Sequence, residues 1–455
     1  MKRKNRLLAL ALATSMCFAV FTGCQQNQAP SAPASQQESQ KPAGSSSGGA
    51  EPEPAAESQT LRIGAQSWMM EKFQLQEAAD KFMEDHPGVT VEFVQVELAD
   101  TTSYVLQWSQ GKTNVDLAIG GSREQAVQYV AKDLIYSFEE GFFDDSLKKE
   151  DFIPSVFELG NIDGTQYMIP LMGEVYYLVV RSDLMKEAGL TDADGKAIPP
   201  KSWEELYDYA VKLTKKDGDT VTQSGLGVDW GNDFMHYTYM GVLQSLRGSI
   251  FEDNSSLLDF QSEEAEYMLT QWAKLVADGV VATDTFADTN AVRTNFKAGN
   301  VAMHLTVHSR WPEYADVLGY DKVTLVPLPG AEENGSLTFI HGMVIPKASQ
   351  CPELAKSFIK ERLMDKDFQL WTLNKYGKMP VLFRNFEGAE HEEWNDIADM
   401  AAKSAAAPLY KDWAKLQNKM QIELQNAILS KQTPRQTLDN LHEELLSLDT
   451  TTGLS

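Results

Sequence analysis

Polar and aromatic residues follow segments that the sequence predicts as buried strands. Gln66-Ser67-Trp68 follows the run 61–65, Ser122-Arg123 follows a glycine pair after the run 115–119, and Asp229-Trp230 lies in a glycine-flanked loop. Carboxylate, amide and hydroxyl groups can hydrogen-bond to sugar hydroxyls, and a Trp ring can pack on the C–H-rich face of a sugar. Ligands of open α/β sheets bind outside the carboxyl ends of strands. These residue types indicate a site for a small polar solute.

Each of these segments also has a structural interpretation. Trp68 can pack under the helix that is expected after it, and Ser122 and Arg123 can belong to a plain turn before a helix. Asp229 and Trp230 can belong to the core instead of a cleft. Both interpretations stay open at this point.

The search for catalytic or metal-binding motifs favours a protein that is not an enzyme. His304 and His308 are four residues apart, but the residues between them favour a strand, so the spacing does not predict a metal site. The sequence contains no phosphate loop, dinucleotide fingerprint or nucleophile elbow. We therefore expect a binding protein without a metal or a cofactor.

The first residues predict export and a lipid anchor. Four basic residues precede the apolar run Leu7–Phe21, which is too short to span a bilayer and is typical of a signal peptide. The run ends in Phe21-Thr22-Gly23-Cys24, which resembles a bacterial lipobox. We expect residues 1–23 to be removed and Cys24 to be lipidated with at least two acyl chains, which anchor a protein stably. The predicted location is extracytoplasmic, on the bacterial cell membrane.

The composition changes after the predicted anchor. Residues 24–58 are rich in Gln, Ser, Pro, Ala and Gly, which predicts a disordered linker. The remainder, 59–455, is too long for one core and favours two lobes. A formal net charge of −25 excludes nucleic acid and anionic surfaces as partners through general electrostatics. Contact with the membrane is therefore expected only through the lipid.

Strand and helix patterns alternate along the chain after residue 59. A short strand at 61–65 is followed by helical spacing over 73–83 and by alternating residues at 89–93, which together predict a β-α-β unit. Ser202 and Glu205 predict a capped helix start. The expected fold class is α/β, with mostly parallel sheets covered by helices.

Short segments, taken in order, resemble the family 1 extracellular solute-binding proteins, the group that includes maltose-binding protein. The similarity extends over essentially all of 59–455. The segments are Phe82–Val91, Tyr167–Pro170, Arg181–Leu184 with Pro200–Leu206, Phe296–Met303, Val326–Gly330, Ile345–Ala348 and Ala355–Ile359.

This resemblance implies a two-lobed, periplasmic-binding-protein-like fold that closes on a ligand. The first lobe is expected at 59–171 plus about 315–341, and the second at 172–314 plus about 342–455. Crossovers are expected near Leu171–Gly173, Trp311–Tyr320 and Ile340–Gly342. The implied function is to capture a mono- or oligosaccharide and deliver it to the permease subunits of an ABC importer. The protein is expected to be a monomer.

The resemblance also implies further ligand-binding residues. Glu174 stands where the family has a cleft glutamate beside the crossover, and Tyr176 follows it closely. Trp311 stands where the family commonly has a stacking aromatic, and Trp413 lies near further cleft aromatics of the family.

Two other functions remain compatible with the sequence. A polyamine site needs several carboxylates and aromatic rings, which Glu174, Asp229 and Trp311 could supply. A surface lipoprotein that binds glycans without a transporter would carry the same anchor and a similar cleft.

Overall fold

The computed structural model describes residues 59–454 except 97–100, 140, 232, 233 and 395. The predicted signal peptide, Cys24 and the linker 24–58 lie outside the described residues. Within the described part of the chain, no helix is long and apolar enough to cross a membrane.

The first lobe is built on a parallel β-α-β unit, as the hydrophobic pattern predicts. Strand β1 (Gln59–Gln66) lies between β2 (Val89–Val96) and β3 (Leu117–Gly121), and both pairs are parallel. Helix α2 (Leu75–Asp85) connects β1 to β2 and buries Leu75, Ala78, Ala79 and Phe82. This spacing places the apolar residues on one helix face, which packs on the core.

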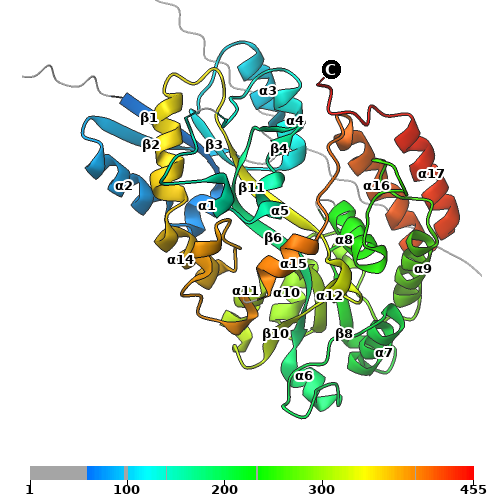
Figure 1. The fold of residues 1–455 in the computed structure, drawn as a ribbon. Coiled ribbons are helices and arrows are strands. Elements are labelled where there is room, and N and C mark those ends of the chain that lie inside the picture. The colour runs from blue at the N-terminus through cyan, green and yellow to red at the C-terminus, as the bar shows by residue number, and fades with distance from the viewer. Residues whose placement is uncertain (1–58, 97–100, 140, 232–233, 395, 455) are drawn as a thin grey trace, which may run out of the picture. The chain divides into compact units, whose positions relative to one another are not determined.

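One long strand, β6 (Ile169–Arg181), belongs to both lobes (Figure 1). Residues 169–175 pair with β11 (Thr338–Val344), which also pairs with β3 of the first lobe. Residues 176–181 pair with β9 (Val301–Val307) and β10 (Val323–Val326) of the second lobe. All residues of β6 except Arg181 are buried, so the connection between the lobes is part of the core.

The second lobe continues the sheet beyond β9. Strand β8 (Thr220–Val228) is parallel to β9, and β7 (Lys215–Asp217) pairs antiparallel with β8. The sheet of nine strands is therefore mixed: the parallel pairs are β1–β2, β1–β3 and β8–β9, whereas the strands that connect the lobes pair antiparallel. The two-lobed α/β fold is confirmed.

The remaining elements cover the sheet or connect its strands. The helices are α1 (Ser67–Lys72), α3 (Thr101–Ser109), α4 (Arg123–Val130), α5 (Pro154–Glu158), α6 (Ser182–Glu187), α7 (Trp203–Leu213), α8 (Met235–Arg247), α9 (Glu263–Ala277), α10 (Ala291–Lys297), α11 (Arg310–Leu318), α12 (Ala331–Asn334), α13 (Pro352–Phe358), α14 (Lys366–Tyr376), α15 (Ile397–Lys403), α16 (Trp413–Ile428) and α17 (Pro434–Leu446). Strands β4 (Asn161–Ile162) and β5 (Thr165–Gln166) form a small separate hairpin.

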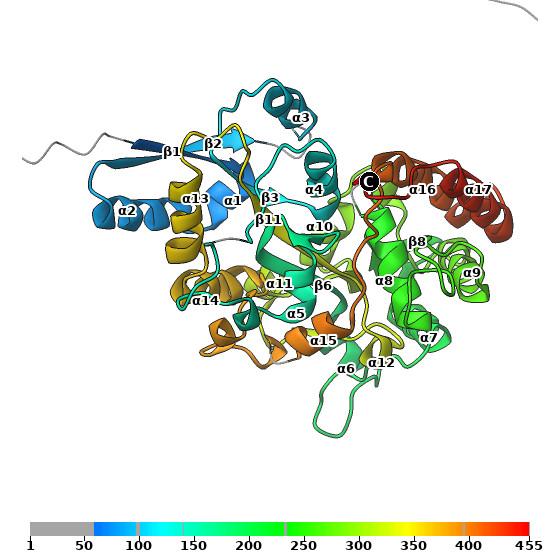
Figure 2. The same cartoon turned by 45° about the horizontal axis from the view of Figure 1, so that its top comes forward.

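The strand pairs correct the expected allocation of the later segments. Residues 315–341 were expected in the first lobe, but β10 pairs with the second-lobe half of β6. Residues 342–455 were expected in the second lobe, but β11 pairs with β3, and α13 lies beside α1 and α2 (Figure 2). Helices α16 and α17 at the end of the chain pack beside α8 and α9 of the second lobe. The segment Trp311–Tyr320 was expected to be a crossover, but its residues up to Leu318 belong to α11.

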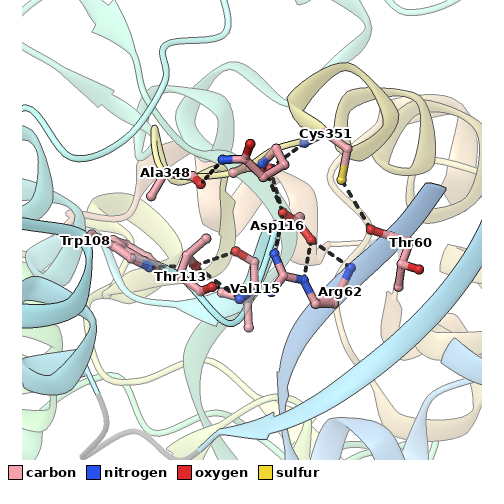
Figure 3. Close-up of polar contacts among 10 residues, drawn as sticks. Thr60, Arg62, Trp108, Thr113, Val115, Asp116, Ala348 and Cys351 are labelled. Atoms are coloured by element: carbon pink, nitrogen blue, oxygen red, sulfur yellow. Dashed lines mark hydrogen bonds and ion pairs between the residues drawn. The ribbon is translucent and has the colours of Figure 1, made fainter. Parts of the chain in front are cut away.

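A buried carboxylate holds the segment after β11 on the first lobe (Figure 3). Asp116 is fully buried and accepts hydrogen bonds from Nε of Arg62 at 2.9 Å and from Oγ of Ser349 at 2.9 Å. Burial alone would raise the pKa of Asp116, but the hydrogen bonds from Arg62 hold it below its usual range. Cys351 lies beside this pair, and burial raises the pKa of its thiol to about 11.

Candidate ligand-binding site

A cavity of about 620 Å³ lies where β6 and β11 pass between the lobes. The first lobe contributes α1 and the residue after it, β11, and residues at the end of α14. The second lobe contributes the loop after β8, the first turn of α10 and most of α11. Three residues singled out from the sequence line this cavity: Trp68, Glu174 and Asp229.

Aromatic rings form the first-lobe wall of the cavity. The ring of Trp68 is packed edge-on against Phe73 at 5.4 Å and against His341 at 5.3 Å between ring centroids. Its Nε1 donates a hydrogen bond to Oε1 of Gln66 at 2.5 Å. Trp68 is half-buried and lines the cavity together with Phe73, Phe339 and Tyr376. Such a wall can pack on the apolar face of a ligand ring.

Glu174 and Lys378 form a buried ion pair in the cavity wall. The two side chains are 4% and 10% exposed, so neither charge is well hydrated. Lys378 also donates to Oγ of Ser309 at 3.2 Å, and Nε2 of His341 lies 3.7 Å from Oε1 of Glu174. Burial, with a smaller contribution from the charge of Lys72, lowers the pKa of Lys378 to about 7. Contact with Glu174 opposes this shift because it stabilises the ammonium form.

Asp229 is fully engaged by protein groups on the second-lobe side. Its carboxylate contacts Nε2 of His304 at 2.9 Å and accepts a hydrogen bond from Oγ1 of Thr306 at 2.5 Å. Nδ1 of His304 in turn contacts the hydroxyl of Tyr314 at 2.7 Å. Burial alone would raise the pKa of Asp229, but His304 and Thr306 lower it. His304 therefore serves a hydrogen-bond network, consistent with its position in a strand.

Charged residues of α10 and α11 form the opposite wall. Glu313 accepts hydrogen bonds from Nε of Arg293 at 2.6 Å and from Nζ of Lys297 at 2.8 Å, and Nη1 of Arg310 lies 3.6 Å away. Burial alone would raise the pKa of Glu313, but the bonds from Arg293 and Lys297 lower it to about 2. Sequence analysis did not identify this cluster. The sequence feature that could have predicted this cluster is the spacing of Arg293 and Lys297, which are four residues apart and therefore lie on one helix face.

Ser122, Arg123 and Tyr176 do not line the cavity. The Ser122 hydroxyl accepts a hydrogen bond from the backbone of Gln125 and caps α4, which is the structural interpretation of that turn. Nη1 of Arg123 donates to the carbonyl of Ala407 at 3.4 Å, and burial lowers the pKa of Arg123. Tyr176 is 1% exposed, and burial raises its pKa.

Three of the proposed stacking aromatics belong to the core. Trp230 stacks on Phe286 at 5.8 Å between centroids, and Trp413 packs edge-on against His236 at 5.7 Å. Trp311 is 1% exposed, and its Nε1 donates to the carbonyl of Val323 at 2.8 Å. The sequence pattern predicts that these aromatic rings are buried. It does not show whether other core side chains or a bound ligand would bury them.

The fold and the interlobe cavity define a class of two-lobed binding proteins, and the comparison with known families agrees. A model of the bacterial extracellular solute-binding protein family matches residues 71–361. The chain belongs to this family, whose members are binding proteins, as the sequence predicted.

Known relatives are distant in sequence but similar in fold. A putative binding protein of Brucella abortus is 22% identical over 369 residues, which are 79% of this chain and 85% of that protein. The GacH receptor of Streptomyces glaucescens, solved without ligand and with acarbose, is 17% identical with a TM-score of 0.72, covering 86% of this chain and 99% of the receptor. An ABC transporter solute-binding protein of Thermotoga lettingae bound to α-D-tagatose is 20% identical with a TM-score of 0.72, covering 86% and 98%.

Proposed function

We propose that this protein is a lipid-anchored extracytoplasmic receptor that captures a carbohydrate and delivers it to an ABC importer. The observation that carries the proposal is the interlobe cavity of about 620 Å³, which combines an aromatic wall with polar groups from both lobes. Its volume lies within the usual range for small-molecule sites. A ligand that touches both lobes favours the closed arrangement, because it binds that form better than the open one.

The comparisons support the ligand class and the importer. The structures of similar fold include receptors with acarbose and with α-D-tagatose, and the second of these is described as an ABC transporter component. The anchor rests on the lipobox-like residues Phe21–Cys24.

The charges of the cavity count against a polyamine. Glu174 pairs with Lys378, and Asp229 is held by His304 and Thr306, so neither carboxylate is left to meet a ligand cation. The other two carboxylates of the cavity are paired as well, Glu313 with Arg293 and Asp316 with Lys375. The basic side chains outnumber the four carboxylates by one, which disfavours a polyamine; they are Lys72, Arg293, Arg310, Lys375 and Lys378.

Replacing Trp68 with alanine is expected to weaken carbohydrate binding by roughly 1–3 kcal/mol, or about 5- to 150-fold, because the ligand loses an aromatic face. The measurement is titration calorimetry with the tightest binder from a thermal-shift screen of mono- and oligosaccharides. Trp371→Ala is the matched control, because Trp371 is also half-buried but does not line the cavity. Equal losses in both variants, or a screen without any binder, would contradict the proposed function.

The anchor is tested separately. Cys24→Ala is expected to abolish incorporation of labelled fatty acid and to shift the protein out of the membrane fraction or leave it unprocessed. The melting temperature should stay unchanged, because Cys24 is outside the two lobes that begin at Gln59. Label retained by the variant would show that the lipid is attached elsewhere.

A further inference from the structure

The lining of the whole cavity carries a small excess of positive charge, because five of its side chains are Lys or Arg and four are Asp or Glu. Glu313 is shared by Arg293, Lys297 and Arg310, so a single carboxylate faces three cations of the second lobe. The protein as a whole carries a formal net charge of −25. The net charge of the cavity lining is therefore opposite in sign to the net charge of the whole protein. The general excess of acidic surface residues does not explain this local charge.

Lys72 adds a cation from the other lobe. It ends α1, lines the same cavity and is half-buried. Among the described residues, no carboxylate forms an ion pair with it, and its nearest ring partner is Tyr376, with Nζ 5.9 Å from the ring centroid. Burial lowers the pKa of Lys72 most, the charges of Arg293, Arg310 and Lys297 lower it further, and the charge of Glu313 opposes them. Lys72 of the first lobe and Arg293 and Arg310 of the second therefore line one cavity from its two sides.

We propose that the natural ligand is an anionic carbohydrate whose carboxylate, sulfate or phosphate group binds between Lys72 of the first lobe and Arg293 and Arg310 of the second. This inference rests on the proposed function and narrows its ligand class. The aromatic wall around Trp68 lines the same cavity and holds the sugar ring.

The placement of the cations explains why an anion is preferred to a neutral sugar. Without an anion, closing the lobes brings Lys72 toward Arg293 and Arg310, and like charges repel. An anion between them converts this repulsion into charge-assisted hydrogen bonds from both lobes. Glu313 stabilises the Lys72 ammonium only through space, because its carboxylate is hydrogen-bonded to Arg293 and Lys297 and forms no ion pair with Lys72. The ligand charge therefore favours the closed form more than a hydroxyl would.

The test compares acidic sugars with their uncharged counterparts by titration calorimetry on the full mature chain. The pairs are galacturonate and galactose, digalacturonate and galactobiose, glucuronate and glucose, galactose 6-sulfate and galactose, and glucose 6-phosphate and glucose. We expect at least one acidic member to bind about 10-fold or more tightly than its neutral partner. The acidic compound that is preferred identifies whether carboxylate, sulfate or phosphate is the recognised group.

Variants of Lys72 show whether the preference arises at this site. Lys72→Gln should reduce the ratio of acidic to neutral affinity about 10-fold, and Lys72→Arg should restore most of it. Lys112→Gln removes one exposed positive charge outside the cavity and should leave the ratio unchanged. If neutral sugars bound and no acidic sugar bound more tightly than its neutral partner, the inference would be overturned and carbohydrate capture would stand. An unchanged ratio in Lys72→Gln would also overturn it. Failure of every sugar in both series would overturn the proposed function as well.

Discussion

Replacing Trp311 with alanine should lower the free energy of unfolding by about 3–5 kcal/mol, the usual cost of removing a large buried aromatic. The ring is 1% exposed and packs edge-on against Trp394 at 5.0 Å and His391 at 4.9 Å between centroids. Its Nε1 also donates to the carbonyl of Val323, which would lose this partner. Urea unfolding followed by circular dichroism measures the loss.

The same variant separates a core role from a ligand-stacking role. Because Trp311 does not line the cavity, we expect the folded fraction of Trp311→Ala to bind carbohydrate within about 3-fold of the wild type. Trp68→Ala should show the reverse pattern, with weakened binding and a small change in stability. If Trp311→Ala lost binding without losing stability, the ring would belong to the site that the family resemblance suggested.

Replacing Glu174 with glutamine should cost about 3 kcal/mol of stability at pH 6, because it leaves the Lys378 ammonium buried without its anionic partner. The difference in free energy of unfolding between Glu174→Gln and the wild type should decrease as the pH rises, because a neutral Lys378 no longer needs an anionic partner. Burial lowers the pKa of Lys378 in the folded state, so between about pH 7 and 10 the unfolded chain binds more protons than the folded protein, and stability rises with pH. Urea unfolding at pH 6 and pH 9 tests both statements.

Two controls establish that the effect belongs to the buried pair. The double variant Glu174→Gln with Lys378→Met removes both charges and should recover most of the lost stability. Lys375→Ala removes the ion pair between Lys375 and Asp316, whose two partners have side chains that are 53% and 44% exposed, respectively. Loss of such an exposed pair should lower the free energy of unfolding by less than about 1 kcal/mol. A Glu174→Gln deficit that is equal at pH 6 and pH 9 would contradict the charged-lysine explanation.

The parts of the fold that could be predicted are those with a local signal. The β1–α2–β2 unit follows from alternating and helical spacing, and the start of α7 from Ser202, whose hydroxyl accepts a hydrogen bond from the backbone of Glu205. The allocation of β10 and β11 could not be predicted in this way. Both are short strands whose partners lie far away in the sequence, so hydrophobic pattern alone leaves their lobe undetermined.

The site could be predicted only where a residue ends a strand or lies in a crossing strand. Trp68 and Glu174 satisfy this condition and line the cavity. The cluster around Glu313 lies on two helices, and on a helix surface such charges usually form solvated ion pairs. These charges differ from an ordinary charged face because they line one cavity together with Lys72 of the other lobe, and this arrangement is a property of the tertiary fold.

The passage of β6 and β11 between the lobes has a consequence for the order in which the chain can fold. Strand β3 obtains its second neighbour only when β11 is present, and α13 reaches α1 and α2 after that. A nascent or truncated chain that ends at Arg181 would leave the edge of β3 unpaired, which favours pairing with other chains. The first lobe is therefore completed late, after α14, which ends at Tyr376, has been made. The two lobes cannot be obtained as separate fragments by a single cut.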